Sequence, residues 1–277
     1  MTAAIALVTC AALPNLEEDD RPLVSALERL GARAVTTVWT DPTVRWEEFD
    51  AVVLRSPIDY VDRLEQFVRW AASIRHLHNS LQTLRWNTDK AYLRDLDAAN
   101  LSVIPTQRLR QDEGADNLPD TSFVVKPSVG VGSIGVGRYG PEERSRGRAH
   151  VRRLHSGGQV ALIQPYLASV EEEGEASLVY VDANYTHAVR RTGFVPSGDV
   201  TPVPYAPTTA QRQLADSVVA YVASRFGTPL YARIDLLHTE SGPAVNEVEV
   251  TDPILHLRSS QESAHRFALA ILQRLTG

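Results

Sequence analysis

Apolar and polar positions alternate between strand-like and helix-like spacing along the first 80 residues of the chain. Three short apolar runs have the length and composition of buried strands: residues 5–9, 34–39 and 51–54. Leucine and valine recur at helical spacing after Asp20, which we expect to cap a helix that ends at Gly31. A second amphipathic helix is predicted over residues 64–72. Strands separated by helices indicate a parallel α/β sheet in this region.

The middle of the chain changes to strands around a glycine-rich run. A strand over 122–128 leads into residues 129–137, which contain four glycines. Such a backbone folds closely over phosphates, so we interpret it as a flexible β-hairpin lid, with a structural turn as the alternative. The Gly-x-Gly-x-x-Gly string from Gly130 to Gly135 does not indicate a Rossmann motif, because no amphipathic helix opens there. A helix over 144–154 and a strand over 161–166 follow.

The C-terminal part is expected to be mainly antiparallel. Its remaining elements are predicted in this order: strands 176–181 and 185–191, a proline-rich loop over 193–207, and helices 211–226 and 261–275. Two apolar runs flanking a Ser-Gly-Pro turn signal predict a β-hairpin between the last two helices. A three-residue loop at 240–242 would place Asp235 opposite Glu247 and Arg233 opposite Glu249. All four charged groups would then share one face of the hairpin.

Three carboxylates on one buried face require a cation. Carboxylates held about 4 Å apart repel by roughly 4 kcal/mol at an effective dielectric near 20. An oxygen-only set formed by Asp235, Glu247 and Glu249 favours Mg²⁺ that enters with substrate phosphates. From the hairpin alone, a solvated acidic face of a sheet is an equal alternative.

Composition excludes several classes of protein. The chain has 277 residues, 43% of them hydrophobic and 22% charged, and a net charge of −6, which describes an ordinary globular protein with a sizeable core. The acidic balance argues against a nucleic-acid partner. The sequence contains no stretch of 18 apolar residues, so we expect no membrane partner. The single Cys10 allows no internal disulfide, so we expect a cytoplasmic protein. The composition is compatible with a monomer or a homodimer.

Arg55 directly follows a predicted strand of the parallel sheet. Ligands of such sheets bind outside the carboxyl ends of the strands, and a guanidinium there suits a substrate carboxylate. A surface ion pair with Asp59 or Asp62 is the alternative.

Motifs along nearly the whole chain resemble the ATP-grasp superfamily. They are Asn-Thr-Asp-Lys at 87–90, Val-Lys-Pro at 125–127 with its glycine run, Gln-Pro-Tyr at 164–166, Gly-Glu at 174–175, His-Ala-Val-Arg-Arg at 187–191, Arg-Ile-Asp at 233–235, and the segment 246–253. The resemblance implies an α/β ATP-grasp fold in three parts: a Rossmann-like pre-ATP-grasp domain over 1–83, a lid subdomain over 84–165, and a C-terminal antiparallel-sheet subdomain over 166–277 that carries the metal site.

The resemblance also implies a role for individual residues. The ATP site would contain Lys90, Lys126, Gly130, Gly132, Ser133, Gly135, Gln164, Tyr166 and Leu167, with Glu172 or Glu175 at the ribose. Asp235, Glu247 and Glu249 would bind two Mg²⁺ ions, with Mn²⁺ as the alternative metal. Arg233 would stabilise the transition state, and Arg191 joins Arg233 and Arg55 as a catalytic candidate.

The implied activity is ATP-dependent ligation of a carboxylate to an amine, or cyclisation within one substrate. Both would pass through an acylphosphate of a small amino-acid-like substrate in specialised metabolism and release ADP and phosphate. A small-molecule kinase and a non-catalytic nucleotide-binding scaffold are the alternatives.

Within the superfamily, segments 55–60 and 84–90 look like the small actinobacterial branch that includes the O-ureido-serine cyclo-ligase of cycloserine biosynthesis. Pro57 and Ile58 depart from the Thr-Trp more common in that branch. The segment 252–256, Asp-Pro-Ile-Leu-His, departs from its acidic-Pro-Ser-Leu-Phe pattern. Both departures fall where substrate would sit.

Overall fold

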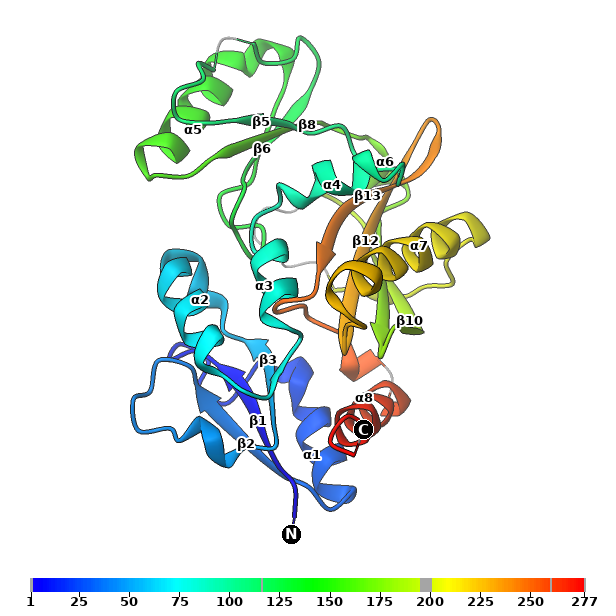
Figure 1. The fold of residues 1–277 in the computed structure, drawn as a ribbon. Helices are drawn as coiled ribbons and strands as arrows, with labels where there is room; N and C mark the ends of the chain where they lie inside the picture. Colours follow the sequence, from blue (N-terminus) through cyan, green and yellow to red (C-terminus); the bar gives the residue numbers. More distant parts are fainter. Residues whose placement is uncertain (1, 116, 195–200, 260, 277) are drawn as a thin grey trace.

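Three β-sheets form the framework of the chain (Figure 1). This computed structural model describes residues 2–115, 117–194, 201–259 and 261–276. The first sheet comes from the N-terminal third, the second from the middle of the chain and the third from the C-terminal part. The mixed α/β class and most of the predicted strands and helices are confirmed.

The N-terminal sheet is parallel, as predicted, with the strand order β2-β1-β3-β4. Its elements are β1 (Ala4–Thr9), α1 (Arg21–Arg29), β2 (Arg33–Val38), β3 (Ala51–Ser56), α2 (Leu64–Ser73) and β4 (Leu77–His78). The sequence did not predict β4, because it has only two residues. Asp20 occupies the N-cap position of α1 as expected, but its carboxylate makes no cap hydrogen bond and instead accepts one of 2.8 Å from Arg55 Nε.

The second sheet is antiparallel, with the strand order β5-β8-β6-β7. Its elements are β5 (Gln107–Leu109), β6 (Phe123–Pro127), β7 (Gly137–Tyr139), α5 (Arg144–Ser156) and β8 (Ala161–Pro165). Val151 and Leu154 of α5 pack against Phe123 and Val125, which forms a separate small core. The glycine-rich run joins the paired strands β6 and β7, so the predicted hairpin is confirmed.

Two short helices connect the first two sheets: α3 (Leu81–Asn87) and α4 (Tyr92–Ala98). Ser80 caps α3 through a hydrogen bond from Thr83 N, Asn87 ends that helix, and Ala91 occupies the N-cap position of α4. The side-chain amide of Asn87 forms hydrogen bonds with backbone groups that are distant in the sequence. It donates to Val248 O at 2.7 Å and accepts from Val250 N at 3.0 Å.

The third sheet has the strand order β11-β10-β9-β12-β13 and is antiparallel. Its elements are α6 (Ser169–Glu172), β9 (Glu175–Val181), β10 (Asn184–Arg191), β11 (Val203–Pro204), α7 (Thr209–Phe226), β12 (Tyr231–Thr239) and β13 (Gly242–Glu249). Ala215, Val218 and Val219 of α7 pack against one face of this sheet. The strand β11 lies within the predicted loop 193–207, of which residues 195–200 lie outside the described structure.

The hairpin of β12 and β13 has the predicted pairs but a different turn. Thr239 pairs with Gly242, so two residues rather than three form the loop. The register then shifts by one residue between Asp235 and Leu236, which restores Asp235 opposite Glu247 and Arg233 opposite Glu249. A β-bulge therefore sets the charged face of the hairpin, because a one-residue shift would otherwise turn it over.

The last helix, α8 (Gln261–Gln273), returns to the first sheet, beside α1 (Figure 1). Phe267 and Ile271 share a core with Ile5 and Leu7 of β1 and with Tyr231 of β12. This core joins the first and third sheets. The residues that the structure describes also form 3-10 helices at Glu18–Asp20, Trp46–Glu48, Ile58–Asp62, Pro141–Glu143 and Leu257–Ser259. Across the described residues, no helix combines the length and apolarity needed to cross a membrane.

Candidate active site

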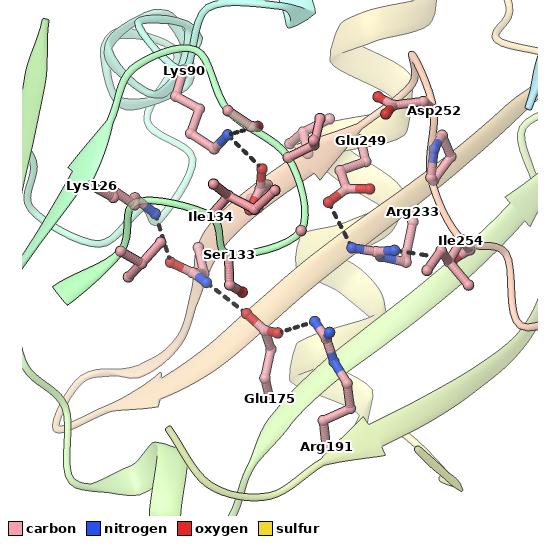
Figure 2. A pocket seen from close by; sticks show the side chains of 18 of the residues that line it. Lys90, Lys126, Ser133, Ile134, Glu175, Arg191, Arg233, Glu249, Asp252 and Ile254 are labelled. Carbon is pink, nitrogen blue, oxygen red and sulfur yellow. Dashed lines mark hydrogen bonds and ion pairs between the residues drawn. The ribbon is translucent and has the colours of Figure 1, made fainter. Parts of the chain in front are cut away.

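One cavity of about 370 Å³ brings together most of the predicted site residues (Figure 2). The predicted residues that line it are Arg55, Lys90, Lys126, Gly130, Gly132, Ser133, Gln164, Tyr166, Leu167, Glu175, Arg191, Arg233, Glu247 and Glu249. Gly135, Glu172 and Asp235 are not among its lining residues. The walls come from all three sheets and from the linker between α3 and α4. Residues distant in sequence therefore face one space.

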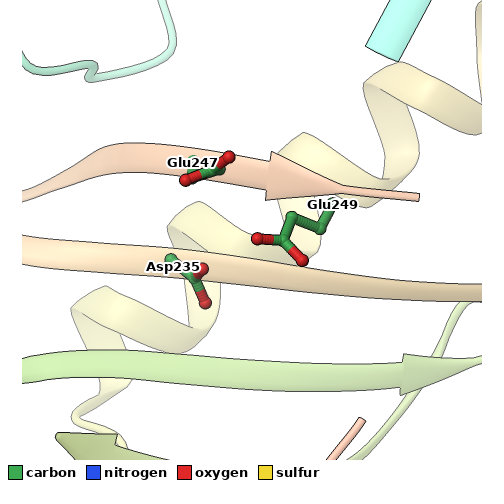
Figure 3. A group of neighbouring side chains, drawn as sticks. All are labelled: Asp235, Glu247 and Glu249. Atoms are coloured by element: carbon green, nitrogen blue, oxygen red, sulfur yellow. The ribbon is translucent and has the colours of Figure 1, made fainter. Parts of the chain in front are cut away.

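Asp235, Glu247 and Glu249 form a compact carboxylate cluster on the β12–β13 hairpin (Figure 3). One oxygen from each lies within 4.8 Å of the others. Arg233 Nη2 donates to Asp235 Oδ2 at 2.8 Å and to Glu249 Oε1 at 2.6 Å. The oxygen-only donor set and its close spacing fit a hard divalent cation such as Mg²⁺.

Burial and neighbouring charges shift the pKa values of Glu249 and Asp235 in opposite directions. Burial, together with the charges of Glu247, Asp235 and Asp252, raises the pKa of Glu249 to about 8, although Arg233 opposes the shift. Burial also opposes ionisation of Asp235, but the adjacent guanidinium of Arg233 outweighs it and lowers the pKa of Asp235. A divalent cation bound here would favour the ionised forms of Asp235 and Glu249. The electrostatics thus agree with the donor geometry.

Lys90 and Lys126, the only lysines of the chain, both reach this cavity. Lys90 Nζ donates to Gly130 O at 2.8 Å and lies 3.0 Å from Glu247 Oε1, so it joins the glycine run to the carboxylate cluster. Burial opposes its charge, yet Glu247 raises the pKa of Lys90. Burial lowers the pKa of Lys126, and the charge of Lys90 adds to that shift. A phosphate between the two ammonium groups would relieve this repulsion.

The glycine run lies over these lysines. A Cβ on Gly130 would stand 2.9 Å from Pro127 Cγ, closer than packed carbon atoms come. Gly132 has a φ of 59°, in the left-handed region that glycine adopts without strain. These two positions explain why the run is rich in glycine where it folds back against β6.

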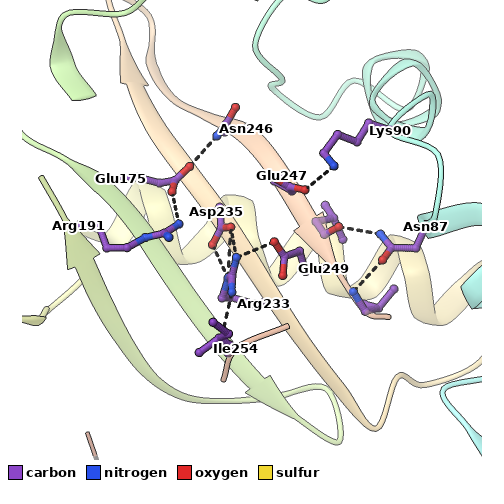
Figure 4. Close-up of polar contacts among 12 residues, drawn as sticks. Asn87, Lys90, Glu175, Arg191, Arg233, Asp235, Asn246, Glu247, Glu249 and Ile254 are labelled. Carbon is purple, nitrogen blue, oxygen red and sulfur yellow. Dashed lines mark hydrogen bonds and ion pairs between the residues drawn. The ribbon is translucent and has the colours of Figure 1, made fainter. Parts of the chain in front are cut away.

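A chain of hydrogen bonds runs along the cavity from Lys126 to Arg191 (Figure 2), and Figure 4 shows its part from Asn246 to Arg191. Lys126 Nζ donates to Asn246 Oδ1 at 3.3 Å, and Asn246 Nδ2 donates to Glu175 Oε1 at 2.6 Å. Arg191 Nη2 donates to Glu175 Oε2 at 2.6 Å. Glu175, rather than Glu172, is therefore the carboxylate that faces the cavity.

Sequence analysis missed two asparagines that position the site. Asn246 is the extra residue of the β-bulge, and the bulge turns its side chain toward Lys126 and Glu175. Asn87 holds the backbone on both sides of Glu249 (Figure 4). Both lie inside motifs that carried the family resemblance, but their sequence neighbourhood does not reveal these partners, which lie 71 to 163 residues away.

The other end of the cavity is apolar. Ile104, Val170 and Leu237 line it beside the predicted Leu167, and these side chains pack in one cluster. Gln164 Nε2 donates to Thr106 Oγ1 at 2.8 Å, which fixes its amide at the edge of this region. Apolar walls with a few fixed polar groups suit a flat heteroaromatic base.

Arg55 borders the cavity, but its side chain is 0% exposed. Its Nε donates to Asp20 at 2.8 Å, and its Nη2 donates to Pro253 O at 2.8 Å. The alternative of a surface ion pair with Asp59 or Asp62 is wrong, because the partner is the buried Asp20. Contact between Arg55 and a substrate carboxylate stays a prediction.

Comparison with known proteins identifies the family. Residues 5–82 match the family described as D-cycloserine synthetase DcsG, N-terminal domain. The cycloserine biosynthesis protein DcsG of Streptomyces lavendulae is 34% identical over 300 aligned positions, which cover 98% of each chain. The chain belongs to the DcsG family. A crystal structure of D-cycloserine synthetase DcsG superimposes with a TM-score of 0.89 at 33% identity, over 99% of this chain and 100% of that one.

More distant structures share the fold of this DcsG-family chain. A D-alanine–D-alanine ligase from Bacillus anthracis complexed with ATP has a TM-score of 0.69 at 11% identity, with coverage of 99% and 98% of the two chains. The RimK-domain ATP-grasp protein from Sphaerobacter thermophilus has a TM-score of 0.72 at 18% identity, with coverage of 98% and 100%. The predicted ATP-grasp fold is therefore confirmed. The protein is an ATP-dependent ligase, and ligases of this superfamily use ATP and Mg²⁺.

Proposed function

We propose that the protein activates the carboxylate of a small amino-acid-like substrate as an acylphosphate and joins it to a nitrogen of the same molecule. The similarity to a D-cycloserine synthetase over 98% of both chains supports ring closure within one substrate. We further propose that the reaction takes place in the cytoplasm.

One observation carries this proposal: a single cavity is lined by Glu247 and Glu249 of the carboxylate cluster, by two ammonium groups and by Arg233. Lys90 and Lys126 line the cavity and would neutralise the phosphates of ATP, and Glu175, which accepts a hydrogen bond from Asn246, would accept from the ribose hydroxyls. Asp235, Glu247 and Glu249 would hold two Mg²⁺ ions, which would neutralise phosphate charge and help to align the terminal phosphoryl group.

The proposed chemistry needs positioning and charge more than it needs a side-chain base. The substrate carboxylate oxygen attacks the terminal phosphorus, and the bond from phosphorus to ADP breaks. The nitrogen then attacks the acyl carbon, the C–N bond forms, and orthophosphate leaves with the displaced proton. Arg233 stabilises the negative charge that develops on the acyl oxygen, because its guanidinium is fixed beside the carboxylate cluster.

Product analysis tests the proposal. The purified protein is incubated with ATP, Mg²⁺ and O-ureido-serine, and then with a panel of amino acids, while ³¹P NMR follows the phosphates and mass spectrometry follows the organic product. We expect equal amounts of ADP and orthophosphate and a cyclic product formed without a second amine. Glu240→Gln, at the exposed tip of the same hairpin, should leave this turnover unchanged. Phosphate retained on the organic product, or AMP with pyrophosphate, would refute the proposal.

A further inference from the structure

Acidic residues line the cavity of the candidate active site on several sides. They are Glu17, Asp19, Asp20, Glu175, Glu247, Glu249 and Asp252. Four of them have a partner cation within 3.0 Å: Asp20 pairs with Arg55, Glu175 with Arg191, Glu247 with Lys90 and Glu249 with Arg233. Asp19 accepts hydrogen bonds from the backbone N–H groups of Leu257 and Arg258. Glu17 and Asp252 form no ion pair with any residue that the structure describes.

Asp252 lies at the end of the cavity where we propose that phosphoryl transfer occurs. It follows Glu249 by three residues, and its charge contributes to the raised pKa of Glu249, so the two carboxylates are close to each other (Figure 2). The backbone directly after Asp252 is fixed, because Arg55 Nη2 donates to the carbonyl of residue 253 at 2.8 Å and Arg233 Nη1 donates to that of residue 254 at 3.0 Å. The carboxylate of Asp252 is therefore held near the proposed reaction centre.

The surroundings of Asp252 leave its charge poorly compensated. Burial raises the pKa of Asp252 to about 6, although the charges of Lys90 and Arg233 oppose this shift without forming an ion pair. Ser56 and Tyr60 line the same cavity and are buried, but their hydroxyl groups carry no positive charge. Burial also raises the pKa of Tyr60 well above its ordinary value, and the charge of Asp252 adds to that shift. A cation that a ligand brings to Asp252 would stabilise this carboxylate.

The proposed substrate has such a cation. In an amino acid, the α-nitrogen and the carboxyl group share the α-carbon, so attack by this nitrogen on its own acyl carbon would give a strained ring of three atoms. Ring closure therefore uses a nitrogen further along the side chain, and the α-nitrogen keeps its proton and its charge. Because the α-ammonium is attached to the carbon that bears the activated carboxylate, the group that binds it must lie near the reaction centre.

We propose that Asp252 binds the α-ammonium group of the substrate. Ser56 and Tyr60 are hydrogen-bond partners available in the same part of the cavity. This contact would orient the carboxylate that is activated and keep the α-nitrogen away from the acyl carbon. The inference rests on the proposed function and narrows its substrate class to α-amino acids that carry a second nitrogen in the side chain.

Two alternatives involve the other carboxylates of the cavity. Glu17, on the loop before α1, is the other unpaired carboxylate, and its backbone N–H donates to Ser56 Oγ at 3.4 Å. Asp252 is the better candidate because it follows the hairpin that carries Glu249 and is near Arg233. A role for Asp252 as a further metal ligand is the second alternative, but the compact group suited to a metal consists of Asp235, Glu247 and Glu249.

Two substrates that differ only in the α-ammonium measure this contact. O-ureido-serine and 3-(ureidooxy)propionate have the same carboxylate and the same side-chain nitrogens, and release of orthophosphate reports the turnover of both. We expect kcat/KM of the wild type to be at least about 100-fold higher for the faster enantiomer of O-ureido-serine, because the analogue leaves the carboxylate of Asp252 without its cation.

Asp252→Asn removes the charge of this side chain and preserves its size. The variant should lower the ratio of the two kcat/KM values to below about tenfold, through slower turnover of O-ureido-serine. Each enzyme preparation is tested with both substrates, so the ratio does not depend on the fraction of folded protein. Glu17→Gln should keep the ratio. Asp62→Asn is the matched control, because Asp62 is exposed, forms no ion pair with a described residue and lies outside the cavity lining, and it should leave both rates unchanged.

The outcomes distinguish this inference from the proposed function. An unchanged ratio in Asp252→Asn, an equal loss with both substrates, or a loss of the ratio in Glu17→Gln instead overturns the role of Asp252. A wild type that forms cyclic products from both substrates with equal kcat/KM overturns it too, while the proposed function stands. Activation of amino acids without ring closure overturns the proposed function alone, because hydroxylamine converts the acylphosphate to a hydroxamate and orthophosphate and gives the same ratio for alanine and propionate. Failure of every carboxylate to yield ADP overturns both.

Discussion

Replacement of Glu247 by glutamine separates the effect of the carboxylate cluster on folding stability from its effect on turnover. At 4.8 Å, and at an effective dielectric near 20, a pair of ionised carboxylates repels by about 3.5 kcal/mol. The attraction between Glu247 and Lys90 across 3.0 Å is about 5.5 kcal/mol on the same scale. Because burial raises the pKa of Glu249 to about 8 whereas Arg233 lowers that of Asp235, we take Asp235 as the main source of repulsion. The two effects nearly cancel, and the net loss is at most about 2 kcal/mol.

Glu247→Gln should therefore fold and melt within about 8 °C of the wild type, as measured by differential scanning fluorimetry. Its phosphate release should fall by at least about 100-fold, the scale of losing one group that stabilises transition-state charge. The stabilisation of the wild type by Mg²⁺ and an ATP analogue should also shrink. Glu240→Gln, at the tip of the same hairpin, is the control for both measurements. Wild-type turnover in Glu247→Gln would contradict the metal-binding role of the cluster and favour the alternative of a solvated acidic face.

Three further predictions concern separate parts of the structure. Lys126→Ala should weaken ATP binding in calorimetry, because a buried cation at the cavity is lost, and unchanged affinity would contradict its placement. Asp20→Ala leaves Arg55 buried without its partner and should lower the free energy of unfolding by about 3–5 kcal/mol in urea, whereas a loss below 1 kcal/mol would contradict the buried ion pair. The raised pKa of Glu249, about 8, means that the folded state keeps a proton that the unfolded chain has released. Without Mg²⁺ and ATP, the contribution of Glu249 to the free energy of unfolding should therefore fall as pH rises from about 5 to 8. Because histidines, with an ordinary pKa near 6.5, titrate in the same range, the wild type is compared with Glu249→Gln, and the variant should lack this part of the slope.

The fold was largely predictable because its elements obey local rules. Strands of four to seven apolar residues and helices with a clear apolar face appear where their periodicity predicts them. The failures involve long-range contacts. Asp20 has the composition of a helix cap, but a buried guanidinium from β3 takes its carboxylate, and Asn87 serves a strand more than 150 residues away. Propensity describes what a residue does alone, and tertiary partners override it.

The candidate site was predictable as a set of residues but not as a geometry. The facing pairs Arg233–Glu249 and Asp235–Glu247 were predicted correctly, but the three-residue loop on which that prediction relied is not present. The structure reaches the same register with a two-residue turn and a bulge at Asn246. The bulge also turns Asn246 into the cavity, which a regular strand could not do while keeping Glu247 on the same face.

The cations of the site explain how such a dense acidic cluster is stable before nucleotide binds. Lys90 and Arg233 contact the same carboxylates that are suited to Mg²⁺, so each carboxylate of the hairpin has a protein cation within 3.0 Å. ATP with Mg²⁺ would bring both phosphates and new cations, so that Lys90 could leave Glu247 for a phosphate without leaving that carboxylate unpaired. Its other contact, the carbonyl of Gly130, belongs to the glycine run that lies over the site. Movement of this one ammonium group would therefore also free the glycine run from the cluster, which couples nucleotide binding to the position of the lid.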